Sequence, residues 1–334
     1  MSHQILFIEL LGGIGDVLVA LPAIQSLAAC HPDSTLTVLT FSPSDELLQS
    51  HPLVHQIVTA AKGTAHQTVE QVLSAQRYDL VVTDTMYEGI ADLVEQSGTE
   101  RTVTDLWRNP PADELTSDRF LNILHQEQLI TAEAIAQYRS PKLYLNPTEY
   151  PNLPQTDGPK ICLYPDAGMA IKRWSSDKFV TLGQQLQQRY NATIYVPEGD
   201  GDQAAVIASQ IPHAQIWPRG SLRQFAGLLA RMDITVAADT GPARIAAALE
   251  VPTITLFGPS WQGRYGQPAP HVNLQAYADC PERRLNFTEQ VCWYSGRCPF
   301  DMRTCTDTLT PKQVMAAADS LLNKTSQRAY ASLS

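Results

Sequence analysis

Residues 233–260 read DITVAADTGPARIAAALEVPTITLFGPS, and this stretch decides the fold class. An apolar run, ITVAA, ends at a turn that contains Gly and Pro. A helical pattern follows, and then a second apolar run, TITLF. Two apolar strands joined by a helix are typical of a parallel β-α-β unit whose strands are covered on both faces. The stretch therefore predicts an α/β protein.

The same alternation recurs along the whole chain. Further strand-like runs occupy residues 5–10, 35–41, 78–85, 160–164 and 192–196. Helical patterns lie between them, for example at residues 16–31, 116–138, 175–190 and 221–232. Strands that alternate with helices predict parallel, doubly wound sheets of the Rossmann type.

The length of the chain predicts two domains. At roughly 150 residues per domain, 334 residues accommodate two separate cores. We expect an N-terminal domain at 1–150 and a C-terminal domain at 151–334, joined through the Pro-rich segment 145–160. Two Rossmann-like halves in succession predict a cleft between them. The last helical pattern, 310–324, can pack on either domain.

Charge and hydropathy exclude several classes of function. Residues 1–150 carry 7 Lys and Arg against 19 Asp and Glu, whereas residues 151–334 carry 17 against 15. Nucleic acid is not expected as a partner, because its backbone requires clustered basic residues. No apolar run approaches the ~18 residues of a membrane span, and the start reads as a strand rather than a signal peptide. We expect a cytoplasmic protein with at most peripheral membrane contact.

The first βα turn carries a glycine-rich loop, GGIGD, at residues 12–16. It is not a dinucleotide fingerprint, because Leu18 stands where the third glycine of GxGxxG belongs. Gly12, Gly13 and Gly15 can bring the backbone close to a substrate. Asp16 has two interpretations: it is an acid that caps the following helix, or it is the edge of an active site.

Three loops of the second half carry candidate ligand-binding residues at strand ends. Thr240 and Gly241 follow Asp239 at a helix start, where free N–H groups bind phosphate. Each loop also has a purely structural interpretation: Asp239 and Thr240 as helix caps, the two cations at 172–173 as a solvated surface pair, and the acidic loop at 197–202 as a turn. All three loops nevertheless open on the same edge of the sheet, which favours a shared binding site. The remaining candidates are Lys172 and Arg173 for a diphosphate, and Glu198, Asp200 and Asp202 for ribose hydroxyls.

Four of the six cysteines, Cys280, Cys292, Cys298 and Cys305, fall in one late segment. The segment invites a structural metal, but it has no C-x-x-C pair, and spacings of 11, 5 and 6 residues are poor for zinc. We therefore expect thiols and no metal site. Trp261 or Tyr265 could stack on a base or simply pack in its loop.

Together, GGIGDVLVALPAIQSL, the KRW at 172–174 and DTGPARIAAALEVPTITLFGP resemble glycosyltransferase family 9, which includes the ADP-heptose:lipopolysaccharide heptosyltransferases. The resemblance spans about residues 4–320. It implies a GT-B fold, meaning two Rossmann-like domains with the active site in the cleft. It further implies inverting, metal-independent sugar transfer, with the donor on the C-terminal domain and the acceptor on the N-terminal domain. No cofactor is implied beyond the nucleotide-sugar substrate, expected to be ADP-linked.

Residue roles follow from the same resemblance. Asp16 matches the general base that deprotonates the acceptor hydroxyl, a role that burial would favour by raising a carboxyl pKa. Lys172 matches the lysine on the donor phosphates, and Asp239 the acid that faces the donor sugar. Thr240 and Gly241 match the backbone cradle, and Glu198 or Asp202 would hold the ribose.

Arg244 departs from the family pattern, in which His stands five residues after the aspartate. Arginine binds phosphate bidentately but does not titrate near pH 7. Together with the acidic first half, this departure predicts an altered acceptor and leaves open a donor other than ADP-heptose.

The expected activity is therefore transfer of heptose or a similar sugar from a nucleotide diphosphate donor to lipopolysaccharide or another glycan or glycolipid. The alternative is a non-catalytic nucleotide-sugar-binding protein on the same scaffold. An epimerase would need further acids and a His in the cleft, whereas His51, His55 and His66 lie in no recognisable motif.

Overall fold

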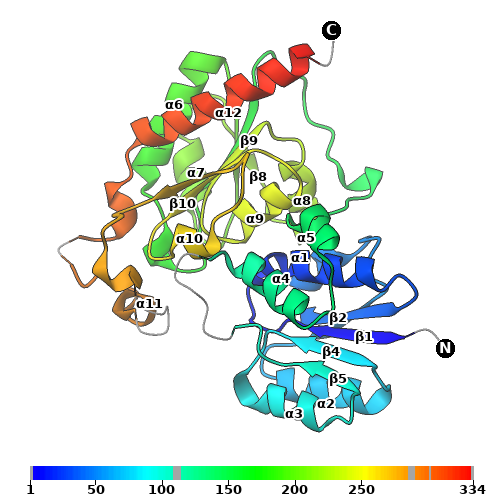
Figure 1. The fold of residues 1–334 in the computed structure, drawn as a ribbon. Helices are drawn as coiled ribbons and strands as arrows, with labels where there is room; N and C mark the ends of the chain where they lie inside the picture. The colour runs from blue at the N-terminus through cyan, green and yellow to red at the C-terminus, as the bar shows by residue number, and fades with distance from the viewer. Residues whose placement is uncertain (1–2, 108–113, 285–289, 301, 332–334) are drawn as a thin grey trace. The chain divides into compact units, whose positions relative to one another are not determined.

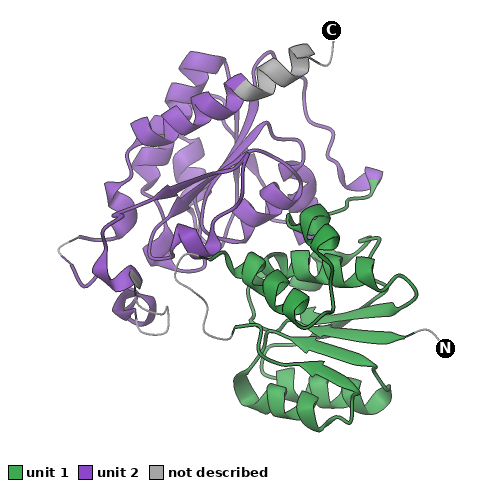
Figure 2. Ribbon diagram, viewed as in Figure 1, with its two compact units in different colours: residues 1–146 green, residues 147–334 purple. Residues whose placement is uncertain are grey.

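The computed structural model describes residues 3–107, 114–284, 290–300 and 302–331. The chain divides into two compact units, residues 1–146 and 147–334 (Figure 2). The boundary predicted from the sequence lay at residue 150, inside the Pro-rich segment.

Unit 1 is built on a five-stranded parallel sheet in the order β3-β2-β1-β4-β5. Helices α1, α4 and α5 pack together on one face, and α2 and α3 pack together on the other (Figure 1). The strands are β1 (Gln4–Ile8), β2 (Thr35–Phe41), β3 (Gln56–Ala60), β4 (Leu80–Thr83) and β5 (Arg101–Val103). The helices are α1 (Ile14–Cys30), α2 (Ala65–Ala75), α3 (Ile90–Gln96), α4 (Thr116–Gln126) and α5 (Ala132–Tyr138).

Unit 2 is built on a six-stranded parallel sheet in the order β11-β10-β9-β6-β7-β8. The strands are β6 (Lys160–Tyr164), β7 (Thr193–Pro197), β8 (Gln215–Trp217), β9 (Ile234–Ala238), β10 (Thr253–Phe257) and β11 (Val272–Gln275). The helices are α6 (Ser176–Tyr190), α7 (Gln203–Ala208), α8 (Leu222–Leu229), α9 (Gly241–Ala248), α10 (Gln262–Tyr265), α11 (Val291–Ser295) and α12 (Pro311–Ala331).

The structure corrects the prediction for residues 116–138 and shows on which unit the last helix packs. The pattern at 116–138 forms two helices, α4 and α5, because the segment between them turns at Gln128, whose φ is positive. The last helix, α12, packs on α6 and on the sheet of unit 2, where Val314, Ala318 and Leu321 are buried in the core.

Each sheet is doubly wound, so each has a switch point where the strand order reverses. In unit 1 this point lies between β1 and β4, and in unit 2 between β6 and β9. Ligands of open α/β sheets bind outside the carboxyl ends of the strands at such points. The loops that follow these four strands are therefore the first places to look for a functional site.

Candidate active site

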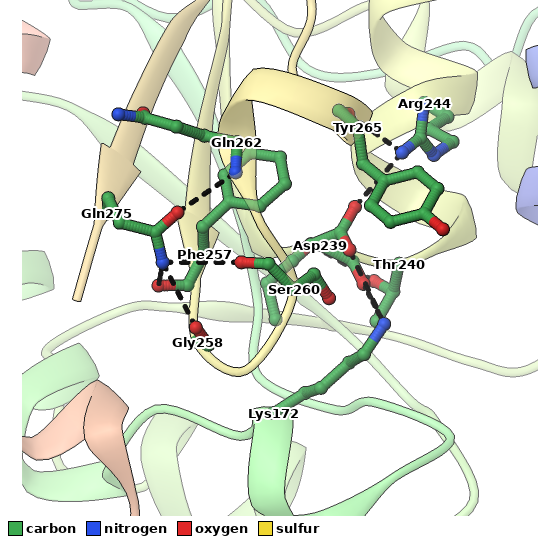
Figure 3. A network of polar contacts seen from close by, with 11 residues as sticks. Lys172, Asp239, Thr240, Arg244, Phe257, Gly258, Ser260, Gln262, Tyr265 and Gln275 are labelled. Carbon is green, nitrogen blue, oxygen red and sulfur yellow. Dashed lines mark hydrogen bonds and ion pairs between the residues drawn. The ribbon is translucent and has the colours of Figure 1, made fainter. Parts of the chain in front are cut away.

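The loops after β6 and β9 meet through Lys172 and Asp239 (Figure 3). Lys172 ends a short 3-10 turn, Ala170–Lys172, in the loop after β6. Its Nζ lies 3.4 Å from Asp239 Oδ2 and donates to the Asp239 main-chain oxygen at 3.2 Å. Two residues predicted separately from the sequence are thus brought together at the switch point of unit 2.

Arg244 contacts the same carboxylate from the first turns of α9. Its guanidinium lies 3.1 Å from Asp239 Oδ1 and donates to the main-chain oxygen of Tyr265 at 2.8 Å (Figure 3). Burial acts to raise the pKa of Asp239, but Lys172 and Arg244 hold that pKa below its usual value. Asp239 is therefore a carboxylate at neutral pH. Two cations against one carboxylate give this cluster a net positive charge.

The N-terminus of α9 lies next to this cluster. Thr240 is its N-cap residue in extended conformation, and its side chain makes no capping bond but donates to the oxygen of Ala238. Gly241 begins the helix and Pro242 occupies its first turn, where a missing N–H costs nothing. Backbone N–H groups at such a terminus favour an anion, as the positive charge of the cluster also does.

Arg173 is engaged elsewhere. Its guanidinium lies 2.7 Å from Asp166 Oδ1, and its Nε donates to the oxygen of Ala167. Asp166 is almost fully buried, and its Oδ2 accepts from the N–H groups of Asp200 and Gly201. Asp166 thus ties the loop after β6 to the loop after β7. Asp166 was not among the residues predicted from the sequence, although its place two residues beyond β6 was a usable signal.

The acidic side chains after β7 lie in different local settings. Glu198 accepts from the main-chain N–H of Arg219 at 3.1 Å, and Asp200 forms an exposed ion pair with the Arg219 guanidinium. Asp202 is the N-cap residue of α7, without a side-chain capping bond. Which of Glu198 and Asp202 contacts a ribose stays a prediction.

Gln275 holds the loop after β10. Its Nε2 donates to the main-chain oxygens of Gly258 and Ser260, and its Oε1 accepts from the N–H of Gln262 (Figure 3). This loop leads into α10, which carries Tyr265 at its end and has Trp261 as its N-cap residue. The base-stacking role of these two aromatic residues stays a prediction.

Trp293, on α11, places its ring over Lys172, with Nζ 4.8 Å from the ring centroid. The cysteine-bearing segment therefore reaches the cation of the candidate site. Burial raises the pKa of the Cys292 thiol, and Cys280 and Cys298 raise it further. Within the described ranges, no group of three or more His, Cys, Asp or Glu residues is arranged to hold a metal ion.

In unit 1, Asp16 closes the glycine loop onto α1. Its Oδ2 accepts from the N–H of Gly13 at 2.9 Å, which is the half of a capping box that an acid in the first turn supplies, since Gly13 has no side chain to make the other half. Gly12 adopts φ +97°, a conformation that favours glycine. Gly15 lies inside the first turn of α1 rather than in the loop, because the helix begins at Ile14. This bond supports the interpretation of Asp16 as a helix cap. The role of Asp16 as a general base stays a prediction.

Two buried acids that were not predicted from the sequence lie at the switch point of unit 1. Glu9 follows β1 and Asp84 follows β4, and each side chain is about 1% exposed. Burial and the nearby Asp16 raise the pKa of Glu9 to about 8, and burial, Glu9 and Asp16 raise the pKa of Asp84. Acids that end adjacent parallel strands are visible in ILFIEL and VVTDT, so a signal existed.

Two doubly wound parallel sheets, each with polar residues at its switch point, are the arrangement of the two Rossmann-like domains of the GT-B fold. The model of glycosyltransferase family 9 (heptosyltransferase) matches residues 110–284. The chain belongs to this family and is a glycosyltransferase, as predicted. Family membership also argues against the non-catalytic alternative. The position of a cleft between the domains stays a prediction.

Similar proteins agree with this assignment. Lipopolysaccharide heptosyltransferase 1 of Pseudomonas aeruginosa is 25% identical over 92% of this chain and 95% of its own. The glycosyl transferase family 9 structure from Veillonella parvula superposes with a TM-score of 0.79 at 18% identity, covering 97% and 98% of the chains. The E. coli heptosyltransferase WaaC with ADP gives 0.69 at 19% identity, covering 95% and 99%. The two solved structures support the fold.

None of the helices in the described part of the chain is long and apolar enough to span a membrane.

Proposed function

We propose that the protein transfers heptose or a similar sugar from an ADP-linked donor to lipopolysaccharide or another glycan acceptor, with inversion and without a metal ion. The observation that carries the proposal is the cluster of Lys172, Asp239 and Arg244 beside the N-terminus of α9. Relatives named as lipopolysaccharide heptosyltransferases, and a similar structure with bound ADP, support the choice of substrates.

On the donor side, the cluster and the helix terminus together suit a diphosphate. Lys172 and Arg244 share one counter-charge, Asp239, so a net positive charge remains for the donor phosphates. As the bond between C1 of the sugar and the phosphate oxygen breaks, the diphosphate gains negative charge. Preorganised cations and N–H dipoles stabilise that charge. We assign this role first to Lys172, since its ammonium is held by a face-on ring and a carboxylate.

On the acceptor side, we assign Asp16 as the general base. The acceptor oxygen forms a bond to C1 on the face opposite the leaving group. Its proton goes to the Asp16 carboxylate, and ADP leaves with the electron pair of the broken bond. A Cβ at Gly13 would lie 2.6 Å from Asp16 Oδ2, so glycine at this position lets the carboxylate close onto the loop, and the bond from Gly13 N–H fixes its orientation.

The charge of the N-terminal half restricts the kinds of acceptor that it can bind. Residues 1–150 carry 19 acidic against 7 basic side chains, so a strongly anionic acceptor would be repelled. We propose an acceptor whose contacting part is neutral, such as an unphosphorylated sugar of a glycan. The cytoplasm remains the proposed location.

A transfer assay tests the proposal. ADP-heptose is incubated with the protein and with heptose-deficient lipopolysaccharide or a neutral glycan, and ADP release and the glycosylated product are measured. Acceptor-dependent ADP release that falls in both Lys172→Ala and Asp16→Asn supports the proposal. Binding of the donor without acceptor-dependent release, across the acceptors tried, would point to a binding protein instead.

A further inference from the structure

Two buried threonines at the end of the cysteine-bearing segment contact the turn that carries Lys172. Thr304 Oγ1 donates to the main-chain oxygen of Ile171 at 2.6 Å, and Thr306 Oγ1 donates to that of Arg173 at 2.9 Å. The first oxygen belongs to the peptide group just before Lys172, and the second to the peptide group just after Arg173. Thr304 is 4% exposed and Thr306 is fully buried, so water cannot easily replace either bond.

Helix capping does not account for these hydroxyl groups. Thr304 is the N-cap residue of the 3-10 turn at 305–308, and its oxygen accepts from the N–H of Thr306. Accepting that bond uses a lone pair of the hydroxyl oxygen, so its proton is still available for the oxygen of Ile171. Both threonine protons are therefore directed at a loop that lies 133 positions away in the sequence.

The same threonines lie against the loop after β10. A Cβ at Gly258 would lie 2.8 Å from Thr306 Cγ2 and 3.5 Å from Cys305 Sγ. Glycine at this position therefore lets the threonine methyl group pack directly on the loop. Thr306 thus contacts both the loop that carries Lys172 and the loop that leads into α10 (Figure 3).

These contacts complete the support of Lys172. Its ammonium lies 3.4 Å from Asp239 Oδ2 and 4.8 Å from the centroid of the Trp293 ring. Those two groups hold the end of the side chain, whereas the threonines hold the main chain from which it projects. A cation that is already in place stabilises charge that develops in a transition state without reorganisation during the reaction.

We propose that Thr304 and Thr306 are positioning residues of the donor site: their hydroxyl groups fix the turn that carries Lys172 and keep its ammonium where the diphosphate leaves. Each threonine acts through Lys172 rather than on the donor. The cysteine-bearing segment then contributes to the site twice, through Trp293 and through these threonines. This inference rests on the proposed role of Lys172.

The first test is the steady-state kinetics of Thr304→Val/Thr306→Val, which removes both hydroxyl groups. We expect kcat to fall roughly 10-fold or more and the KM for the donor to change less than about 3-fold, because a misplaced charge affects the transition state more than the ground state. Thr304→Ser/Thr306→Ser keeps both hydroxyl groups and should retain most of the wild-type kcat.

Thr253→Val is the matched control. This threonine is also buried, and its hydroxyl donates to the main-chain oxygen of Val251 at 2.8 Å. It lies at the start of β10, at the opposite edge of the same sheet, so its replacement should leave kcat unchanged.

A double-mutant cycle separates positioning from a general effect on the fold. In Lys172→Ala the ammonium is already absent, so the two valines should lower kcat no further. The same loss of kcat with and without Lys172 would overturn the inference. A serine variant as slow as the valine variant would overturn it too, because the hydroxyl groups would then not matter.

A second test needs no activity. Protons over the face of an aromatic ring resonate upfield, so Trp293 should shift the NMR signal of the Lys172 ε-methylene group. The signal is assigned with carbon-13-labelled lysine through Lys172→Ala, and Trp293→Leu gives its position without the ring. In Thr304→Val/Thr306→Val the signal should move most of the way to that position, and an unmoved signal would overturn the inference. If the signal moves but the wild-type protein transfers no sugar, the proposed function fails and the positioning of Lys172 does not.

Discussion

Lys172 Nζ lies 3.4 Å from Asp239 Oδ2, although the two residues are 67 positions apart in the sequence. The contact joins the loops after β6 and β9, the strands on either side of the switch point in unit 2. Glu9 and Asp84 occupy the equivalent point in unit 1, after β1 and β4. In both units, therefore, these charged residues lie after the two strands that flank the switch point, where open α/β sheets bind their ligands.

The two interpretations of Asp16 are separated by a pair of variants. In Asp16→Asn, the amide oxygen can still accept from Gly13 N–H, so the helix cap survives while the base is lost. Turnover should fall at least 100-fold with donor affinity unchanged. Asp16→Ala should lose turnover too, and also about 1 kcal/mol of stability. Near-wild-type turnover in Asp16→Asn would leave Asp16 as a cap alone.

Trp293 should support donor binding through Lys172. Replacement by Leu removes the ring that lies over the ammonium, an interaction of about 0.5–2 kcal/mol. We expect ADP affinity to fall roughly 3- to 10-fold in Trp293→Leu, measured by calorimetry. Tyr294→Leu is the control, because this neighbour on α11 is 69% exposed. Equal losses in both variants would indicate damage to α11 instead.

Arg244 should act as a permanent positive charge. Arg244→Ala should weaken ADP binding about 10-fold, as the loss of a charged hydrogen bond does. Arg244→His introduces the residue expected from the family pattern, which titrates near pH 6.5 when unperturbed. ADP affinity should then be higher at pH 6 than at pH 8, and the ratio between the two should be larger for Arg244→His than for the wild-type protein. A pH dependence identical to that of the wild type would argue against contact with the phosphates.

Asp166 should stabilise unit 2 rather than bind substrate. Asp166→Ala removes the partner of Arg173 and the acceptor of two N–H groups in the loop after β7. We expect a loss of about 2–3 kcal/mol in urea unfolding, discounted because the Arg173 side chain is 30% exposed. Asp166→Asn should lose less, since its amide oxygen can still accept. Unchanged stability in Asp166→Ala would mean that the two loops are held by other contacts.

Glu9 should make stability fall as the pH rises from about 4.5 to about 8. Its pKa is about 8 when folded and 4.5 when unfolded, so the folded state holds the extra proton between these values. Stability contributed in this way is lost as pH increases. Buried His51 and His271, with pKa values lowered to about 4, act oppositely, but only below pH 6.5. The urea concentration at the midpoint of unfolding should therefore decrease as the pH is raised from about 6.5 to about 8. In Glu9→Gln this decrease should be smaller.

The sequence predicted the central strands of both sheets and, in the candidate site, the residues Lys172, Asp239 and Arg244. Runs such as ILFIEL, ITVAA and TITLF are continuous and apolar because the strands they form are buried on both faces. The edge strands β3, β5, β8 and β11 were missed. They have only three to five residues, and most of their side chains are partly exposed, so they carry no apolar run.

The remaining site residues could not be chosen from spacing alone. Lys172 and Arg173 are adjacent, yet one faces Asp239 and the other Asp166. A local pattern does not specify which partner a loop residue meets across the sheet edge. Glu9 and Asp84 each follow an apolar run, which marks them as acids at strand ends, but only the register of β1 and β4 shows that the two strands are adjacent.

The central claim, that unit 2 holds an ADP-linked donor at Lys172, is tested most directly by calorimetric titration of the protein with ADP, UDP and GDP. We expect ADP to bind in preference to UDP and GDP, and we expect Lys172→Ala to weaken ADP binding by about 10- to 100-fold. Failure of all three nucleotides to bind, or an unchanged ADP affinity in Lys172→Ala, would contradict it.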